Sequence, residues 1–195
     1  NRLKLETVLL EQLRDELLTI YSDVNGDYYT LNMAQDSHYK IMDYIDQNIN
    51  YADSMCFDFQ WIKSDEYIYP KDAVYGRIKE EGLDIITNDT IRYMTQSIYE
   101  STFPRLSRSN SFYPDISEYL DDYYLQNFKP NTDYTLQYSY SRPSDTLGGE
   151  IYPGNEVRFP FEITRNGINR KLTKGYVPLD FEALKNDSKF IMLLN

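Results

Sequence analysis

The sequence contains one cysteine, one histidine and one tryptophan in 195 residues. A single cysteine, Cys56, excludes an intramolecular disulfide and leaves the redox compartment open. Its neighbours Met55 and Phe57 indicate a small buried apolar side chain rather than a nucleophile. The single histidine, His38, has no second histidine with which to hold zinc, so we expect a satisfied core histidine that is neither a metal ligand nor a catalytic base.

Long apolar runs and clusters of positive charge are also lacking. No stretch of about 18 apolar residues occurs, so no membrane-spanning segment is predicted within these residues. Thirty-one Asp and Glu against twenty Lys and Arg give a formal charge of −11, which argues against a nucleic-acid partner. The nearest basic group, Arg105 with Arg108, carries only two charges.

Motifs that would carry chemistry are missing as well. No Gly-x-Ser-x-Gly elbow occurs, and Gly148-Gly149 is not followed by the Lys-Ser/Thr of a phosphate-binding loop. A calcium loop starting at Asp23 would need Gly at its sixth position and Glu at its twelfth, where this sequence has Tyr28 and Ala34. We therefore expect no catalytic residue, no cofactor, no metal site and no enzymatic activity.

The strongest positive signal is a heptad pattern over residues 3–49, which predicts one long amphipathic helix. The dipeptide Asn25-Gly26 is a turn signal, but the apolar phase passes through it, so we expect a continuous helix with at most a kink at Gly26. The predicted buried seam consists of Leu10, Leu13, Leu17, Ile20, Val24, Tyr28, Leu31, Gln35, His38, Met42, Ile45 and Ile49.

Further helices are predicted in the middle of the chain. Residues 50–64 suit a short helix or a packed loop, and residues 71–81 suit a helix that ends at Gly82. A second long helix is expected from Thr90 to about residue 127, kinked near Pro104 and loosened at Pro114. Two long helices predict a mainly α fold, an elongated helical bundle, and this intramolecular partner ranks above a parallel coiled-coil dimer.

The composition changes at Pro130. Alternating and β-favouring residues between 132 and 176 predict a small β annex of two or three strands, and Asn166-Gly167 predicts a type I′ hairpin turn. Loops are expected at residues 147–149 and 153–155, and short helical segments at 178–184 and after Asp187. We thus expect one domain with three parts, a helical bundle at 1–130, the β annex at 131–177 and a C-terminal helical segment at 178–195.

Two tripeptides match the acceptor pattern for N-glycosylation, beginning at Asn88 and at Asn186. Both also supply the side-chain oxygens that cap helix N-termini, and capping is the stronger interpretation. The twenty tyrosines recur largely at helical spacing, so a packing role is favoured over a ligand platform.

Three stretches resemble an uncharacterised family of membrane-anchored Bacteroidetes proteins. They are YGRIKEEGLDIITNDTIR at residues 75–92, RLKLE with LLEQL at residues 2–6 and 9–13, and LDFEALKNDSKF at residues 179–190. The resemblance implies a transmembrane helix upstream of residue 1, an extracytoplasmic helical domain on the periplasmic side of the inner membrane, and one more long helix after the C-terminal stretch. It implies no activity and no functional residues, and the β-like segment at 132–176 departs from the family pattern.

These features together predict a non-enzymatic extracytoplasmic interaction or sensory module. Its expected partners are another protein or a second copy of the chain, together with the membrane through the upstream helix. If the family's last helix is missing, a neighbouring molecule is expected to cover the exposed part of the seam. The alternative is a domain that binds a small molecule or a glycan through tyrosines and acidic residues near Tyr134 to Tyr152.

Overall fold

The computed structural model describes residues 2–112, 116–142, 145–147, 150–152 and 154–194. The chain forms two compact units, and each is assembled from two separate segments. Unit 1 comprises residues 1–28 and 66–114, and unit 2 comprises residues 29–65 and 115–195. Composition predicted a division of the chain at residues 130 and 177. The division into two units is different, because each unit consists of two segments that are separate in the sequence.

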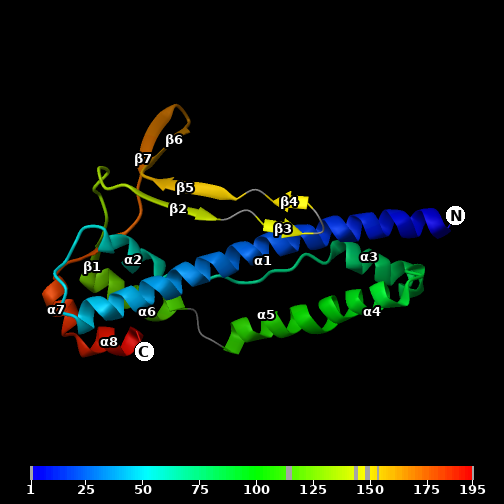
Figure 1. Cartoon of the computed structure of the whole chain (residues 1–195), viewed down its shortest axis with the longest axis horizontal. Helices are drawn as coiled ribbons and strands as arrows, with labels where there is room; N and C mark the ends of the chain where they lie inside the picture. Colours follow the sequence, from blue (N-terminus) through cyan, green and yellow to red (C-terminus); the bar gives the residue numbers. More distant parts are fainter. Residues whose placement is uncertain (1, 113–115, 143–144, 148–149, 153, 195) are drawn as a thin grey trace. The chain divides into compact units, whose positions relative to one another are not determined.

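The protein is mainly α, as the sequence predicts, with a set of short antiparallel strands (Figure 1). The helices are α1 (Arg2–Asp46), α2 (Met55–Trp61), α3 (Ala73–Glu81), a 3₁₀ turn (Leu83–Ile85), α4 (Asp89–Ser97), a π-helical turn η2 (Ile98–Thr102), α5 (Phe103–Phe112), α6 (Ile116–Asn127), α7 (Phe181–Lys185) and α8 (Ser188–Leu194).

Helix α1 confirms the predicted long N-terminal helix and continues through Gly26 without interruption. The acidic stretch from Asp23 to Asp27 therefore lies within a helix and not in a calcium-binding loop. The expectation of one continuous buried seam is wrong, however. Tyr28 is 65% exposed and Leu31 is 43% exposed, because α1 buries one stripe in the core of unit 1 and another in the core of unit 2.

Unit 1 packs the first half of α1 against α3, the 3₁₀ turn and the segment from α4 to α5. Tyr75 and Tyr99 stack at its centre with their ring centroids 4.5 Å apart, which fits the predicted packing role of tyrosine. The buried residues of this core are Leu9, Leu13, Ile20, Tyr75, Ile78, Ile85, Ile86 and Tyr99.

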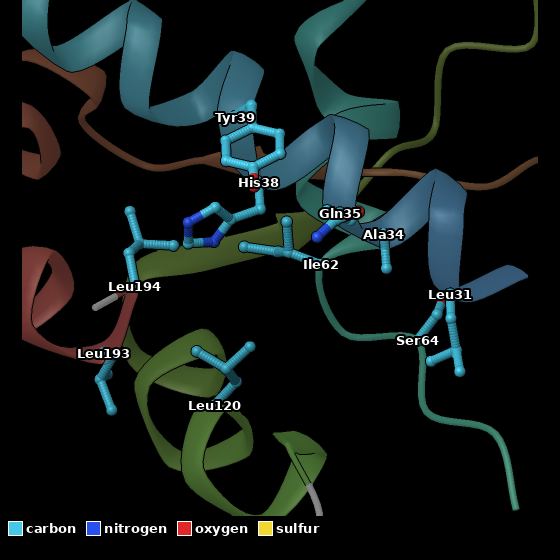
Figure 2. Close-up of a pocket in the computed structure, with 10 residues that line it drawn as sticks. All are labelled: Leu31, Ala34, Gln35, His38, Tyr39, Ile62, Ser64, Leu120, Leu193 and Leu194. Carbon is cyan, nitrogen blue, oxygen red and sulfur yellow. The ribbon is translucent and has the colours of Figure 1, made fainter.

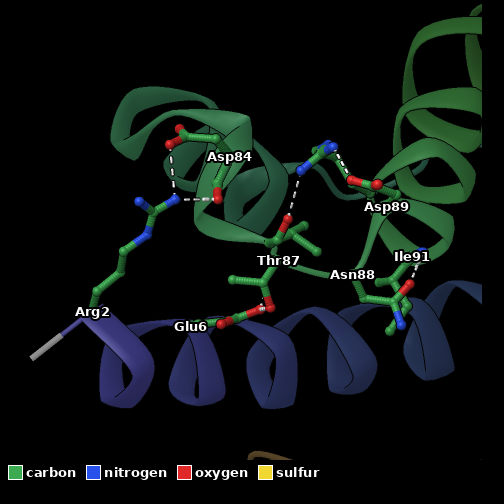
Figure 3. Close-up of polar contacts among 9 residues, drawn as sticks. Arg2, Glu6, Asp84, Thr87, Asn88, Asp89 and Ile91 are labelled. Carbon is green, nitrogen blue, oxygen red and sulfur yellow. Dashed lines mark hydrogen bonds and ion pairs between the residues drawn. The ribbon is translucent and has the colours of Figure 1, made fainter.

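Two polar side chains near the start of α1, Glu6 and Arg2, contact the segment between α3 and α4 (Figure 3). The buried Glu6 carboxylate accepts from both the backbone N–H and the hydroxyl of Thr87, each at 2.7 Å. Arg2 pairs with Asp84 at 2.8 Å. Asn88 caps α4 as predicted, since its side-chain oxygen accepts from the backbone N–H of Ile91.

Pro104 does not interrupt the helical path between α4 and α5. It comes two residues after the π-helical turn η2, so the helix departs from regular α geometry close to the residue that lacks a backbone N–H. The predicted loosening at Pro114 lies outside the described residues, as do parts of the loops expected at 147–149 and 153–155. Helix α6 begins at Ile116 and belongs to unit 2.

Unit 2 gathers the second half of α1, the short helices α2, α7 and α8, and helix α6 around an aromatic core. The region at 50–64, predicted as a short helix or a packed loop, forms α2. The buried residues of this core are Ile41, Met55, Phe59, Ile62, Leu120, Tyr123, Tyr124, Phe128, Phe181, Leu184, Phe190 and Leu194.

In the described part of the chain the strands form four two-stranded antiparallel sheets, so the annex has more strands than the predicted two or three. The pairs are β1 (Phe128–Pro130) with β8 (Tyr176–Pro178), β2 (Tyr138–Arg142) with β5 (Asn155–Phe159), β3 (Asp145–Leu147) with β4 (Glu150–Tyr152), and β6 (Phe161–Arg165) with β7 (Ile168–Leu172).

The hairpin predicted at Asn166-Gly167 is confirmed. It joins β6 to β7, and both turn residues have positive φ angles, 54° and 74°, as a type I′ turn requires. Asp187 fulfils the capping role predicted for the second tripeptide, because its carboxylate accepts from the backbone N–H of Lys189 at the start of α8.

Candidate functional site

A cavity of about 400 Å³ lies along α1 in unit 2 (Figure 2). We call it the leucine groove. It lies within the size range of known ligand pockets, about 300 to 1,000 Å³. Its lining residues are Leu31, Ala34, Gln35, His38, Tyr39, Ile62, Ser64, Leu120, Leu193 and Leu194.

One wall of the leucine groove is a single face of α1. Leu31, Ala34, Gln35 and His38 follow one another at steps of three, one and three, which places them on one side of a helix. Figure 2 shows α1 on one side and α6 with α8 on the other, with the His38 imidazole extending into the space between them.

The opposite face of α1 is held by a buried carboxylate of α2. Asp58 accepts hydrogen bonds from the Ser37 hydroxyl at 3.0 Å and from the Tyr44 hydroxyl at 2.8 Å, and the Lys40 ammonium lies 3.5 Å away. Burial, together with the hydrogen bond to Asp58, raises the pKa of Tyr44 above its usual value. These contacts fix the rotation of α1 about its axis within unit 2, and they turn Leu31 and His38 toward the leucine groove.

Helix α8 supplies the wall formed by Leu193 and Leu194. It is fixed at its start, because the Tyr123 hydroxyl of α6 donates to Asp187 at 2.5 Å and the Tyr123 ring stacks on the buried Phe190. The hydrogen bond from Tyr123 lowers the pKa of the Asp187 carboxyl. The groove is therefore built on helices that are anchored elsewhere in the core.

The structure corrects the interpretation of His38. It is half-buried on the wall of the leucine groove, with its ring edge-on to Tyr39 at a centroid distance of 5.7 Å, and is not enclosed in the core. Gln35, the other polar position of the predicted seam, is exposed. The heptad pattern placed both residues on the apolar face of the helix. It could not predict that this part of the face is not covered by other segments.

Cys56 confirms its predicted role as a buried apolar side chain. It is fully buried in α2, and burial together with nearby carboxylates raises the pKa of its thiol to about 12. A thiol with such a pKa is protonated at neutral pH and is a poor nucleophile. Among the described residues, no three His, Cys, Asp or Glu side chains gather as metal ligands would.

Another cavity is lined mainly by residues outside the predicted tyrosine and acidic surface at 134–152. It has a volume of about 170 Å³ and includes Tyr51, Asp53, Lys129 and Asp133 in its lining. We call it the Tyr51 cavity. The Tyr51 hydroxyl oxygen is buried without a hydrogen-bond partner among the described residues, and burial raises its pKa to about 12.

Two tyrosines of the predicted surface, Tyr138 and Tyr140, are used for packing instead. Tyr138 stacks on Phe57 at 4.3 Å and accepts a hydrogen bond from the Trp61 indole at 2.8 Å. Tyr140 lies edge-on to Trp61. Strand β2 thus uses these rings to attach to α2 within unit 2.

Comparisons with protein-family models, with curated proteins and with solved structures find no match. In the part of the chain that the structure describes, none of the helices has the length and apolar character needed to cross a membrane.

Proposed function

We propose that the protein is a non-enzymatic interaction module that binds an amphipathic helix of a partner protein in the leucine groove. The observation that carries the proposal is the open face of α1. Leu31, Ala34, Gln35 and His38 have the spacing of a helix that packs against another helix, and Leu31 is 43% exposed. Docking of an apolar helical face into such a groove is a recurring mode of peptide recognition.

The surrounding charge supports a basic partner helix. Asp46 is exposed and lies eleven residues, about three helical turns, after Gln35, on the same side of α1. On α6, the exposed Asp121 follows the lining residue Leu120 and is paired with Lys63 at 2.5 Å. Lysine and arginine residues flanking the apolar face of the partner would complement these carboxylates and raise the rate of association.

The test uses a synthetic amphipathic peptide with a leucine face and lysine flanks, and a scrambled peptide of the same composition as its control. We expect the amphipathic peptide to bind, measured by fluorescence anisotropy, and to shift the amide resonances of Leu31, Ala34 and Leu120. Ala34→Glu places a charge on the apolar wall and is expected to weaken binding about tenfold or more.

The matched control is Gln47→Glu, which makes the same change of charge at an exposed position after α1 and outside the groove. Two results would reject the groove as the binding site. One is equal affinity of the wild type and Ala34→Glu for the amphipathic peptide, and the other is equal affinity of the wild type for the amphipathic and the scrambled peptide. If a chain extended beyond Asn195 no longer binds the peptide, the occupant of the groove is part of the same polypeptide. This result would contradict the proposal of a partner protein.

The family resemblance supports a location as well. We propose that the module lies on the periplasmic side of a bacterial inner membrane and is tethered by a helix upstream of residue 1. A phosphatase that is active only outside the cytoplasm, fused to the C-terminus of the full-length gene product, is expected to be active. An inactive fusion that accumulates to normal levels contradicts this location.

We also propose that the helices form an elongated intramolecular bundle rather than a parallel dimer. The support is that each half of α1 contributes buried residues to a core completed by other segments of the same chain. Sedimentation equilibrium is expected to give a monomer, and small-angle scattering would measure the elongation. A dimer at micromolar concentration would contradict the bundle.

A small polar ligand in the Tyr51 cavity is the second candidate function. The charged lining favours it, because Asp53, Lys129 and Asp133 offer hydrogen-bonding groups of both signs to a polar ligand. A thermal-shift screen with monosaccharides tests this proposal. A ligand at 100 times its dissociation constant adds about 2.7 kcal/mol to the stability, and Lys129→Met should reduce the shift.

A further inference from the structure

The hairpin formed by β6 and β7 has two chemically different faces. Its register pairs Phe161 with Leu172, Ile163 with Arg170, and Arg165 with Ile168. Paired residues project to the same side of a sheet, and successive pairs along the strands project to opposite sides. One side therefore carries Phe161, Ile163, Arg165, Ile168, Arg170 and Leu172, which we call the hairpin face, and the other carries Glu162, Thr164, Asn169 and Lys171.

The hairpin face is open to solvent. All ten strand residues are exposed, including Phe161 at 39%, Ile163 and Leu172 at 38% each, and Ile168 at 57%. A two-stranded hairpin normally needs a packed face for stability. Here four large apolar side chains lie on one face, and none of them is buried by the described part of the chain.

The charge of the hairpin face opposes that of the protein. Arg165 and Arg170 lie among the apolar side chains, and no acidic residue shares this face. Lys174 adds positive charge just after β7, while Lys171 lies on the other side of the hairpin opposite Glu162. The whole chain has a formal charge of −11, so the hairpin is a local basic region in an acidic protein.

We propose that the hairpin face inserts shallowly into the headgroup region of an anionic lipid bilayer. Phenylalanine, isoleucine and leucine side chains enter the boundary between headgroups and acyl chains. The arginine stems extend along the apolar surface and bring their guanidinium groups to the lipid phosphates. The proposal of lipid binding depends only on the residues of the hairpin face. It does not depend on the proposed binding of a helix in the leucine groove.

The size of the hairpin face favours a bilayer over a protein. Two strands of five residues span about 17 Å by 10 Å, or about 170 Å². A stable protein partner needs about 800 Å² on each side. A bilayer sets no such minimum, because each inserted side chain and each nearby cation contributes separately to binding.

The experiment uses the purified chain with vesicles of equal parts phosphatidylglycerol and phosphatidylcholine, and with vesicles of phosphatidylcholine alone. We expect co-sedimentation with the anionic vesicles, reduced at higher salt and much weaker with the neutral ones. The double variant Arg165→Gln with Arg170→Gln is expected to bind about 30-fold more weakly. Replacing both Ile163 and Ile168 by Ser should weaken binding at least as much.

The controls separate the hairpin face from net charge and from misfolding. Arg14→Gln with Arg77→Gln makes the same change of net charge in unit 1 and should leave binding unchanged. Ile168→Trp provides a second measurement, because brominated lipids should quench the fluorescence of the introduced indole. The wild type, whose single Trp61 is buried, gives the background for this comparison. Additional quenching in the variant would establish insertion even if another variant fails to fold.

Three results would overturn the proposal. The first is equal binding of wild type to both kinds of vesicle, and the second is binding that the hairpin substitutions do not change. The third is absence of vesicle binding together with hairpin-dependent binding to polyglutamate, which would assign the face to an acidic protein.

Discussion

Glu16 accepts hydrogen bonds from two elements that are distant in the sequence. Its carboxylate lies 2.9 Å from the backbone N–H of Val74, near the start of α3, and 2.7 Å from the hydroxyl of Tyr99. Glu6 and Asp58 have the same kind of role in their own units. Part of the acidic excess of the sequence therefore consists of acceptors that join helices, and not only of surface charge.

Replacing Glu16 by Ala is expected to lower the free energy of unfolding by about 2 to 3 kcal/mol. The substitution leaves the Val74 N–H and the Tyr99 hydroxyl without their acceptor in a partly buried site. Tyr99→Phe removes only the donor and should cost about 1 kcal/mol. Urea denaturation measures both, and a loss below about 0.5 kcal/mol for Glu16→Ala would show that the bonds are not important for stability.

The stability of unit 1 is expected to depend on pH through Glu6. The hydrogen bonds from Thr87, with a smaller contribution from Arg2, lower the pKa of Glu6 below its usual 4.5. A carboxyl whose pKa is lower in the folded state contributes stability that is complete above the unfolded pKa and is lost as the pH falls through the folded pKa. The loss should therefore begin as the pH falls below about 4.5.

Glu6→Gln keeps an acceptor oxygen but cannot titrate. Denaturation from pH 6 down to pH 3 should show a smaller decrease in stability for this variant than for the wild type. Parallel curves for the two proteins would contradict the assignment to Glu6.

At the scale of elements, two glycines give opposite predictions. Gly76 lies inside α3, where an added Cβ would meet nothing within 4 Å, so Gly76→Ala should stabilise the protein by about 0.5 to 1 kcal/mol. Gly175 has a φ of 122°, and an added Cβ would lie 2.7 Å from the Cys56 sulfur, so Gly175→Ala should destabilise it by about 1 to 3 kcal/mol. Thermal unfolding of both variants checks the opposite signs.

Elements set by local chemistry were predictable from the sequence. The Asn88 cap, the Asn166-Gly167 turn and the long helix α1 all follow from residues close to one another in the chain. The number of strands could not be predicted from the sequence, because β2 pairs with β5 and β1 pairs with β8 across long separations in the chain. Strand pairing at such distances leaves no periodic signal within either strand.

The candidate site shows the same limit. The heptad pattern correctly placed Leu31, Gln35 and His38 on one face of α1, since periodicity defines a helix face. Periodicity does not say what covers that face. The other walls come from Ile62, Leu120 and Leu194, which only the tertiary fold brings beside α1.

At the scale of the whole molecule, two separate cores imply two centres of stability. Ile78 is fully buried in unit 1, and Leu184 is buried in unit 2. Each replacement by Ala should cost about 2 to 5 kcal/mol, chiefly within its own unit. Hydrogen exchange is expected to show that Ile78→Ala weakens protection in unit 1 and leaves the amides around Phe59 and Phe190 protected. Equal loss in both units would show that they unfold together.

Composition could not reveal this division. The change at Pro130 is real, but it separates helical from extended sequence and not one core from the other. Residues 29–65 and 115–195 share a core although the whole second segment of unit 1 lies between them. Only contacts between distant segments define such units.

Because Cys56 is buried, the rate at which its thiol is labelled reports local unfolding of unit 2. The thiol is enclosed between α2 and the Gly175 segment, so a thiol-specific reagent reaches it only when these separate. Because the sequence has one cysteine, the labelling rate follows a single site. Leu184→Ala should accelerate labelling and Ile78→Ala should not, so a simple colorimetric time course measures the fluctuations of one unit without any introduced probe.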